Sequence, residues 1–263
     1  MEISNKNVIV TGGANGIGKA LAKAFKNAGA SYILIADLDE TEGQRTADEL
    51  GIKFKKTDVS SESDIIELIA TANNDTQSID IFCSNAGIGG APMLLDVSTE
   101  DWQNIWEINV MSHIYAAKNV LPQMIEKGSG YLMNTASAAG LLTQVGAAPY
   151  SVTKAAALSL AEWIKITYGN KGIGVSCLCP QAVKTAMTAN GAGTAGVDGM
   201  IEPDECAAAV IEAIEKEQFL ITPHGEVLEY INRKANNYDR WISGMQRLQE
   251  RYEEFYGDLL KDK

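Results

Sequence analysis

A glycine-rich stretch near the N-terminus constrains the fold more than any other feature of the sequence. Residues 7–13 read NVIVTGG, a short apolar run that ends in glycines, and the next segment carries Ile17, Leu21 and Phe25 at helical spacing. This pattern predicts a strand, a loop and a helix in that order. Small residues in such a loop let the backbone approach a pyrophosphate, whose charge the helix N-terminus stabilises. An ordinary turn with packing glycines is the simpler alternative.

Strand and helix patterns alternate along the rest of the chain. Further segments that read as buried strands are 31–37, 52–60, 78–87, 128–137, 171–180 and 217–223. Helical patterns lie between them, chiefly at 40–50, 99–125, 151–168 and 203–217. The alternation predicts an α/β fold with a doubly wound parallel sheet and helices on both faces. Because no linker or repeat interrupts it, we expect a single domain over residues 1–263.

Charge and composition exclude several classes of function. The formal net charge is -12, so a nucleic-acid backbone would be repelled. No apolar run reaches membrane-spanning length, and the N-terminus has no signal-peptide core, so we expect a cytoplasmic protein with no membrane partner. The four cysteines show no CxxC spacing and the only histidines are His113 and His224. We therefore expect no metal site.

An acidic residue at the end of the second predicted strand indicates which cofactor would bind. Asp37 follows the glycine loop by about 20 residues, where a carboxylate can accept a hydrogen bond from a ribose 2′-hydroxyl. The same carboxylate would repel a 2′-phosphate, and neither Asn15 nor Leu38 is basic. The sequence therefore predicts NAD rather than NADP, although Asp37 is also a candidate strand-end cap. Asp58, followed by Val59, is predicted to contact adenine or to be an ordinary turn residue.

Tyr150 and Lys154 lie four residues apart in a predicted helix and so share one face. A tyrosine with a pKa of about 10 is a poor base at neutral pH. A nearby ammonium group, and a positive nicotinamide ring, would favour the phenolate, so Tyr150 could take a proton from an alcohol. Ser137, just past the fifth predicted strand, could stabilise charge on the reacting oxygen. A surface tyrosine–lysine pair is the alternative that these two residues alone would suggest.

Several of these motifs together resemble the short-chain dehydrogenase/reductase family, in its shorter single-domain branch. They are TGGANGIG, SNAG, Asn109, Ser137 and YSVTK. The resemblance implies a Rossmann-like seven-stranded sheet, a Ser-Tyr-Lys triad and an NAD(P)-linked interconversion of alcohol and carbonyl. It also implies that Asn109 binds a water or main-chain group in a proton relay from Lys154, and that the protein is a homotetramer or homodimer.

The same resemblance, with the loop pattern, assigns one set of residues to the cofactor. They are Gly12, Asn15, Gly16, Ile17, Gly18, Asp37, Leu38, Asp58, Val59, Asn85, Ala86, Gly87, Tyr150, Lys154, Pro180, Val183 and Thr185. The chain departs from the family pattern at Gln181, since family members commonly carry glycine after this proline. A side chain there is expected to alter the substrate pocket.

The C-terminal part of the chain departs further from the family pattern. Residues 225–263 are predicted to be a helical extension, whose apolar stripe comprises Trp241, Met245, Leu248, Tyr252, Phe255 and Leu259. This stripe could dock on the chain's own core, contact another subunit or cover the pocket. Residues 185–200, rich in Gly and Ala, are expected to form a mobile loop or lid. Residues expected to line an apolar pocket are Met93, Ala138, Leu141, Leu142, Gln144 and Met187.

The predicted function is an NAD-dependent oxidoreductase that interconverts a secondary alcohol and a ketone, a small-molecule substrate, with Tyr150 as general base or acid. The alternative is a non-catalytic NAD(H)-sensing or interaction protein on the same scaffold. A nucleotide-sugar epimerase and an enoyl reductase fit less well, because the first usually has a different glycine spacing and the second a wider spacing of Tyr and Lys.

Overall fold

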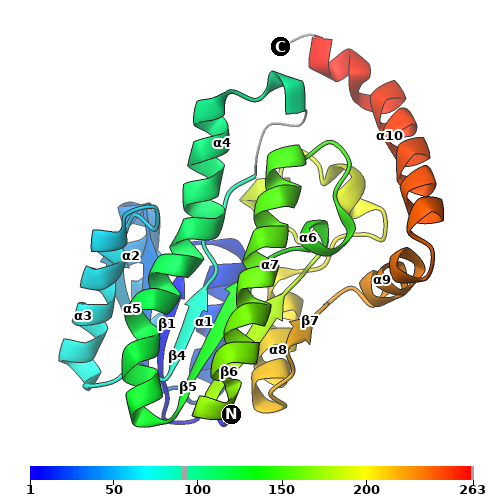
Figure 1. Ribbon diagram of the computed structural model, residues 1–263. Helices are drawn as coiled ribbons and strands as arrows, with labels where there is room; N and C mark the ends of the chain where they lie inside the picture. Colours follow the sequence, from blue (N-terminus) through cyan, green and yellow to red (C-terminus); the bar gives the residue numbers. More distant parts are fainter. Residues whose placement is uncertain (90–93, 262–263) are drawn as a thin grey trace.

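A parallel β-sheet forms the centre of the molecule (Figure 1). The computed structural model describes residues 1–89 and 94–261, with side chains through residue 253. Within these residues the sheet has seven strands in the order β3-β2-β1-β4-β5-β6-β7, and all neighbouring pairs are parallel. They are β1 (Asn7–Thr11), β2 (Tyr32–Asp37), β3 (Lys53–Lys56), β4 (Ile81–Ser84), β5 (Gly130–Thr135), β6 (Ile173–Leu178) and β7 (Leu220–Ile221). Because the chain changes direction between β1 and β4, a crevice forms at their carboxyl ends.

Helices cover both faces of this sheet, as the alternating pattern predicts. One face carries α1 (Gly16–Asn27), α2 (Glu40–Leu50) and α8 (Pro203–Glu215), and the other carries α3 (Glu62–Thr76), α5 (Ser112–Lys127) and α7 (Ala148–Tyr168). Each interface has its own apolar core, with Phe25 fully buried in the first and Leu68 in the second. The predicted doubly wound α/β fold is confirmed. The predicted strands are longer than the observed ones at their ends, where loop residues leave the sheet.

The alanine-rich face of α7 packs on the sheet of its own chain. Ala157 and Ala161 are fully buried in the core, whereas Ala155 is exposed. A side chain at Gly140 on α6 (Ala138–Leu142) would lie 2.6 Å from the carbonyl oxygen of Lys154. Close packing on two sides therefore fixes the turn of α7 that carries Tyr150 and Lys154.

The long helix predicted at 99–125 is interrupted in its middle. It consists of α4 (Thr99–Trp106), a five-residue π-helix (Glu107–Met111) and α5. Helical periodicity cannot reveal such an insertion, because apolar positions recur on both sides of it. The π-helix contains Asn109, which is fully buried, and π-helical turns are frequent at functional sites.

The segment at 185–200 is more ordered than its composition predicts. It contains two short 3₁₀ turns, Ala186–Thr188 and Gly193–Gly196. Hydroxyl groups attach it to the body: Thr188 Oγ1 donates to the carbonyl of Val183 at 2.7 Å, and Thr194 Oγ1 donates to that of Val145 at 3.2 Å. The composition did not predict these turns, because they depend on side chain–backbone hydrogen bonds and not on an apolar periodicity; the expectation of a mobile loop or lid stays a prediction.

The predicted C-terminal helical extension is present as α9 (Glu226–Asn236) and α10 (Tyr238–Lys261). Figure 1 shows α10 rising beside the α/β body and joined to it through α9. Trp241 packs with Tyr230 and with the small apolar cluster around Leu142 and Val227. Phe255 and Leu259, predicted for the same stripe, lie outside the described side chains. Within the described residues, no helix has the length and apolar character needed to cross a membrane.

Candidate active site

A cavity of about 360 Å³ follows the carboxyl edge of the sheet. All the residues predicted to bind the cofactor, from Gly12 to Thr185, line this one cavity. Their role as cofactor contacts stays a prediction. Lining residues that the sequence did not single out are Thr57, Ile88, Ile108, Thr135, Ala136, Ala186 and Thr188. Of these, Thr135 could have been identified from the sequence, because it lies at the carboxyl end of a predicted strand.

The glycine loop has a backbone that side chains would disrupt. Gly12 and Gly16 have φ values of +65° and +52°, in the left-handed region that favours glycine. A Cβ at Gly18 would lie 1.9 Å from the carbonyl oxygen of Gly12. The N-cap residue Asn15 makes no side-chain capping bond to α1, so N–H groups of its first turn are available to an anion. The loop therefore fits the pyrophosphate of a dinucleotide.

Asp37 does act as a strand-end cap, which was the alternative to a ribose contact. Its Oδ2 accepts a hydrogen bond from the Ala14 N–H at 3.0 Å, and its Oδ1 accepts one from the Asp39 N–H at 3.1 Å. The carboxylate is still half-buried at the cavity wall. Since each carboxylate oxygen can accept more than one hydrogen bond, the cap and a ribose contact are compatible.

Asn85 connects the ends of three strands. Its Nδ2 donates to the carbonyl of Thr11 at 3.1 Å, and its Oδ1 accepts from Thr135 Oγ1 at 3.0 Å. These bonds span β1, β4 and β5, so they fix the shape of the cavity floor at the point where the strand order reverses.

Asn109 holds the chain that follows β4. Its Oδ1 accepts from the Ile88 N–H and its Nδ2 donates to the Ile88 carbonyl, both at 2.9 Å. A second bond from Nδ2 reaches Thr153 Oγ1 on α7 at 3.2 Å. A Cβ at Gly87 would lie 3.1 Å from both Asn109 Oδ1 and Lys154 Nζ. Of the two partners expected for Asn109, water or main chain, the structure contains the main-chain one.

Ser137, Tyr150 and Lys154 come together at the end of β5. Lys154 is almost fully buried, and its Nζ donates to the carbonyl of Thr135 at 3.0 Å and lies 5.6 Å from the centre of the Tyr150 ring. Burial lowers the pKa of Lys154 to about 8. Ser137 caps α6: its Oγ accepts from the Ala139 N–H at 3.1 Å.

The pKa of Tyr150 depends on its surroundings in the fold. Burial raises it above the usual value for a tyrosine, and a hydrogen bond with the Ser137 side chain lowers it only in part. The contribution expected from a nicotinamide ring stays a prediction, and without it the ammonium group of Lys154 does not offset the effect of burial. The physical reason is that desolvation penalises the phenolate, while the ammonium group lies beside the ring and bonds to a backbone carbonyl.

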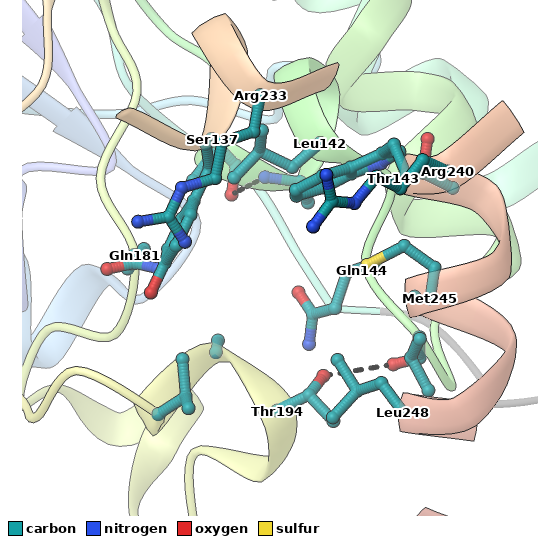
Figure 2. A pocket seen from close by; sticks show the side chains of 18 of the residues that line it. Ser137, Leu142, Thr143, Gln144, Gln181, Thr194, Arg233, Arg240, Met245 and Leu248 are labelled. Atoms are coloured by element: carbon teal, nitrogen blue, oxygen red, sulfur yellow. Dashed lines mark hydrogen bonds between the residues drawn. The ribbon is translucent and has the colours of Figure 1, made fainter. Parts of the chain in front are cut away.

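A second cavity, of about 770 Å³, opens beside Ser137 (Figure 2). Its walls come from α6 and the loop after it, from the 185–200 segment, and from α9 and α10. Ala138, Leu142 and Gln144 line it as predicted, whereas Met187 lines the first cavity. Leu141 is not among the lining residues, and Met93 lies outside the described residues.

Gln181 lies between the two cavities and lines both. Its Nε2 donates to Asp198 Oδ2 at 3.0 Å, and Asp198 Oδ1 accepts from Tyr230 Oη at 3.0 Å. Its Oε1 is buried and has no hydrogen-bond partner among the described residues. The Gln181 side chain therefore connects the chain after β6 to the 185–200 segment, which bonds in turn to α9 through Asp198; a glycine at position 181 could not make this connection.

Comparison with known proteins identifies the family. A family model described as short chain dehydrogenase matches residues 6–194. The chain belongs to the short-chain dehydrogenase family. An uncharacterized oxidoreductase of Staphylococcus aureus strain MRSA252 is 31% identical over 215 residues, which cover 81% of this chain and 92% of that protein. The 1-deoxy-11-beta-hydroxypentalenate dehydrogenase of Streptomyces exfoliatus is 31% identical over 253 residues, 92% of each protein.

A solved structure of this family has the same architecture. The short-chain dehydrogenase/reductase from Burkholderia phymatum in complex with NAD superposes with a TM-score of 0.84 at 26% identity, over 91% of this chain and 96% of that one. This chain is accordingly a short-chain dehydrogenase family oxidoreductase, with a Rossmann-like fold that binds NAD in that relative.

Proposed function

We propose that this short-chain dehydrogenase is an NAD-dependent enzyme that interconverts a secondary alcohol and a ketone. One observation carries the proposal: the side chains of Tyr150 and Ser137 come together where the two cavities meet. Tyr150 lines the first cavity, Ser137 lines the larger one, and the Ser137 side chain lies close enough to Tyr150 to lower its pKa. A substrate oxygen between them would have a proton acceptor and a hydrogen-bond donor within reach.

The roles of the side chains follow from their positions. The glycine loop and Asp37 would hold NAD in the first cavity, where the cofactor would supply a hydride acceptor. Tyr150 Oη takes the hydroxyl proton in oxidation and returns it in reduction. Ser137 Oγ donates to the reacting oxygen, and Lys154 Nζ supplies positive charge beneath the Tyr150 ring. Because burial raises the pKa of Tyr150, the phenolate needs further positive charge, which a bound nicotinamide cation would supply.

Asp37 supports NAD over NADP. Its carboxylate is at the cavity wall beside Leu38 and Asn15, so no basic side chain is present there to receive a 2′-phosphate. The relative from Burkholderia phymatum was solved with NAD. The Streptomyces relative is named as a dehydrogenase of a hydroxy compound, which supports an alcohol as the reduced substrate.

The alternative of a non-catalytic NAD(H)-sensing protein has less support. A buried lysine whose pKa is lowered to about 8 destabilises the folded state, and a binding protein has no need to retain it beside Tyr150. Assembly as a homodimer or homotetramer and a cytoplasmic location stay predictions.

The test is a pair of titrations followed by an activity screen. We expect NADH to quench tryptophan fluorescence at much lower concentration than NADPH. We then expect NADH formation from NAD with at least one member of a panel of secondary alcohols that includes hydroxy acids. Equal binding of NADPH would contradict the cofactor assignment. NADH binding without turnover of any alcohol or ketone would favour the sensing alternative.

A further inference from the structure

The second cavity is rich in arginine in a chain that has little of it. The sequence contains five arginines, and three of them, Arg233, Arg240 and Arg251, line this cavity. No Asp or Glu is among its lining residues in the part of the chain that the structure describes. The formal net charge of the chain is -12, so this cluster opposes the overall field of the protein and would concentrate anions locally.

Two of these guanidinium groups face the cavity. Figure 2 shows the Arg233 and Arg240 side chains directed into it from α9 and α10. Arg233 also pairs with Glu229 at 3.1 Å and lies over the Tyr230 ring. Arg240 forms no ion pair among the described residues, so its charge is available. A planar guanidinium group binds carboxylate and phosphate oxygens through two parallel hydrogen bonds.

The acidic groups near this cavity already have partners. Asp198 approaches it from the 185–200 segment, but both of its oxygens accept hydrogen bonds, from Gln181 and from Tyr230. Glu229 is engaged with Arg233. The Glu229 pair uses only Nη2 of Arg233, so an entering ligand would meet the remaining N–H groups of Arg233 as well as the charges of Arg240 and Arg251.

The wall between the arginines and Ser137 is largely apolar. Side chains that contribute to it are Leu142, Val145, Val197, Trp241, Met245 and Leu248. A cavity of about 770 Å³ is large enough for a ligand well beyond a simple alcohol. Its reactive end, apolar middle and cationic end match a molecule that is an alcohol or ketone at one end and an anion at the other.

We infer that the substrate carries an anionic group, a carboxylate or a phosphate, which Arg240 and Arg233 bind, and an apolar body that spans the cavity to Ser137. The inference deepens the proposed function and rests on it for the reacting end only. The residues that would bind the anion belong to α9 and α10, so anion binding can be measured without turnover. The third and fourth turns of α10, which carry Met245, Leu248 and Arg251, form the outer wall of this site.

Binding of simple amphiphiles tests the anionic end directly. Calorimetric titration with decanoate, decyl phosphate and decanol, each in the presence of NAD, separates carboxylate, phosphate and neutral headgroups on one apolar chain. We expect at least one anion to bind about tenfold or more tightly than decanol, since hydrogen bonds to charged groups are the stronger ones. The preferred anion identifies the headgroup.

Matched variants locate the effect. Arg233→Met combined with Arg240→Met should abolish the preference for the anion, and Arg240→Lys should retain part of it. Arg247→Met, on the same helix but not on the cavity wall, should leave it unchanged. Equal binding of decanol and both anions, or an anion preference that survives the double substitution, would overturn the inference.

A comparison of the turnover of secondary hydroxy acids with that of their methyl esters distinguishes this inference from the proposed function. The inference predicts a kcat/KM ratio of acid to ester well above one in the native chain and near one in the double variant. Equal turnover of acids and esters would overturn it and leave the proposed function standing. No turnover of any compound would overturn the proposed function, and the amphiphile titrations would still decide the inference.

Discussion

The side-chain amide of Asn109 is hydrogen-bonded to the backbone of Ile88 in both directions, with each bond 2.9 Å long. Through this pair, a buried π-helix fixes the chain that leaves β4 and lines the cofactor cavity. The pairing also keeps Gly87 within close reach of Lys154. A buried polar residue with such partners is costly to replace, because its partners would be left unsatisfied.

Asn109→Leu should therefore impair both stability and cofactor binding. The substitution leaves the partly buried N–H and carbonyl of Ile88 without side-chain partners, so we expect a loss of about 1–2 kcal/mol in the free energy of unfolding and weaker NADH binding. Urea unfolding and NADH titration measure the two effects. Asn104→Leu, at an exposed position of α4, is the matched control and should change neither. An Asn109→Leu protein with native NADH affinity would show that the Ile88 contact does not shape the cavity.

Gly18→Ala should damage the glycine loop. A methyl group there would lie 1.9 Å from the Gly12 carbonyl oxygen, so the loop or the start of α1 must move, at a cost of about 1–3 kcal/mol. We expect NADH affinity to fall as well. Gly225→Ala serves as the control, because a Cβ at that position has nothing within 4 Å. Similar melting temperatures and NADH affinities for both variants would contradict this reading of the loop.

Asp37→Asn should relax the preference for NAD. The substitution removes the negative charge, while the amide oxygen still accepts a hydrogen bond from the Ala14 or Asp39 N–H. We expect the ratio of NADPH to NADH affinity to rise by about tenfold, the equivalent of about 1.4 kcal/mol of lost repulsion. Fluorescence titration of both nucleotides measures it, and Asp39→Asn is the control at the N-cap of α2. An unchanged ratio would mean that Asp37 acts only as a strand-end cap.

Burial of Lys154 predicts a specific dependence of stability on pH. Its pKa in the folded chain is about 8, below the usual 10.5. Between these values the unfolded chain holds a proton that the folded chain has released, so the free energy of unfolding rises with pH. The free energy of unfolding of the native chain, relative to that of Lys154→Met, should therefore rise by about 3 kcal/mol as the pH increases between these two pKa values.

Urea unfolding at several pH values measures this difference. Lys165→Met on the same helix, at a less buried position, should show no such trend. A flat difference between the native chain and Lys154→Met would mean that Lys154 keeps its proton in the folded state up to its ordinary pKa.

Much of the fold and of the cofactor cavity was predictable from the sequence. Strand and helix periodicities are local signals, and the carboxyl ends of parallel strands must meet at one edge, so Asn85 and Ser137 could be placed together in advance. The π-helix at Asn109 was not predictable, because one inserted residue leaves the apolar pattern on each side intact. The effect of burial on the pKa of Tyr150 was also not predictable, since desolvation depends on neighbours from several elements.

The arginine-lined cavity was beyond sequence reasoning for a different reason. Arg233 and Arg240 are about a hundred residues away from Ser137 along the chain, and the apolar stripe of α10 was equally consistent with docking, a subunit contact or a pocket wall. Only the three-dimensional course of α9 and α10 brings their guanidinium groups to the cavity beside Ser137. Likewise, the link from Gln181 through Asp198 to Tyr230 joins segments that no periodicity connects.

The most direct test of the proposed mechanism is the rate of NADH formation by Tyr150→Phe against that of the native chain, with the alcohol that the native chain oxidises fastest. The substitution removes one hydroxyl and keeps the ring beside Lys154. The account predicts that the variant binds NADH as the native chain does but loses at least about a hundredfold in kcat, as expected when a general base is removed. Undiminished turnover by Tyr150→Phe would contradict it.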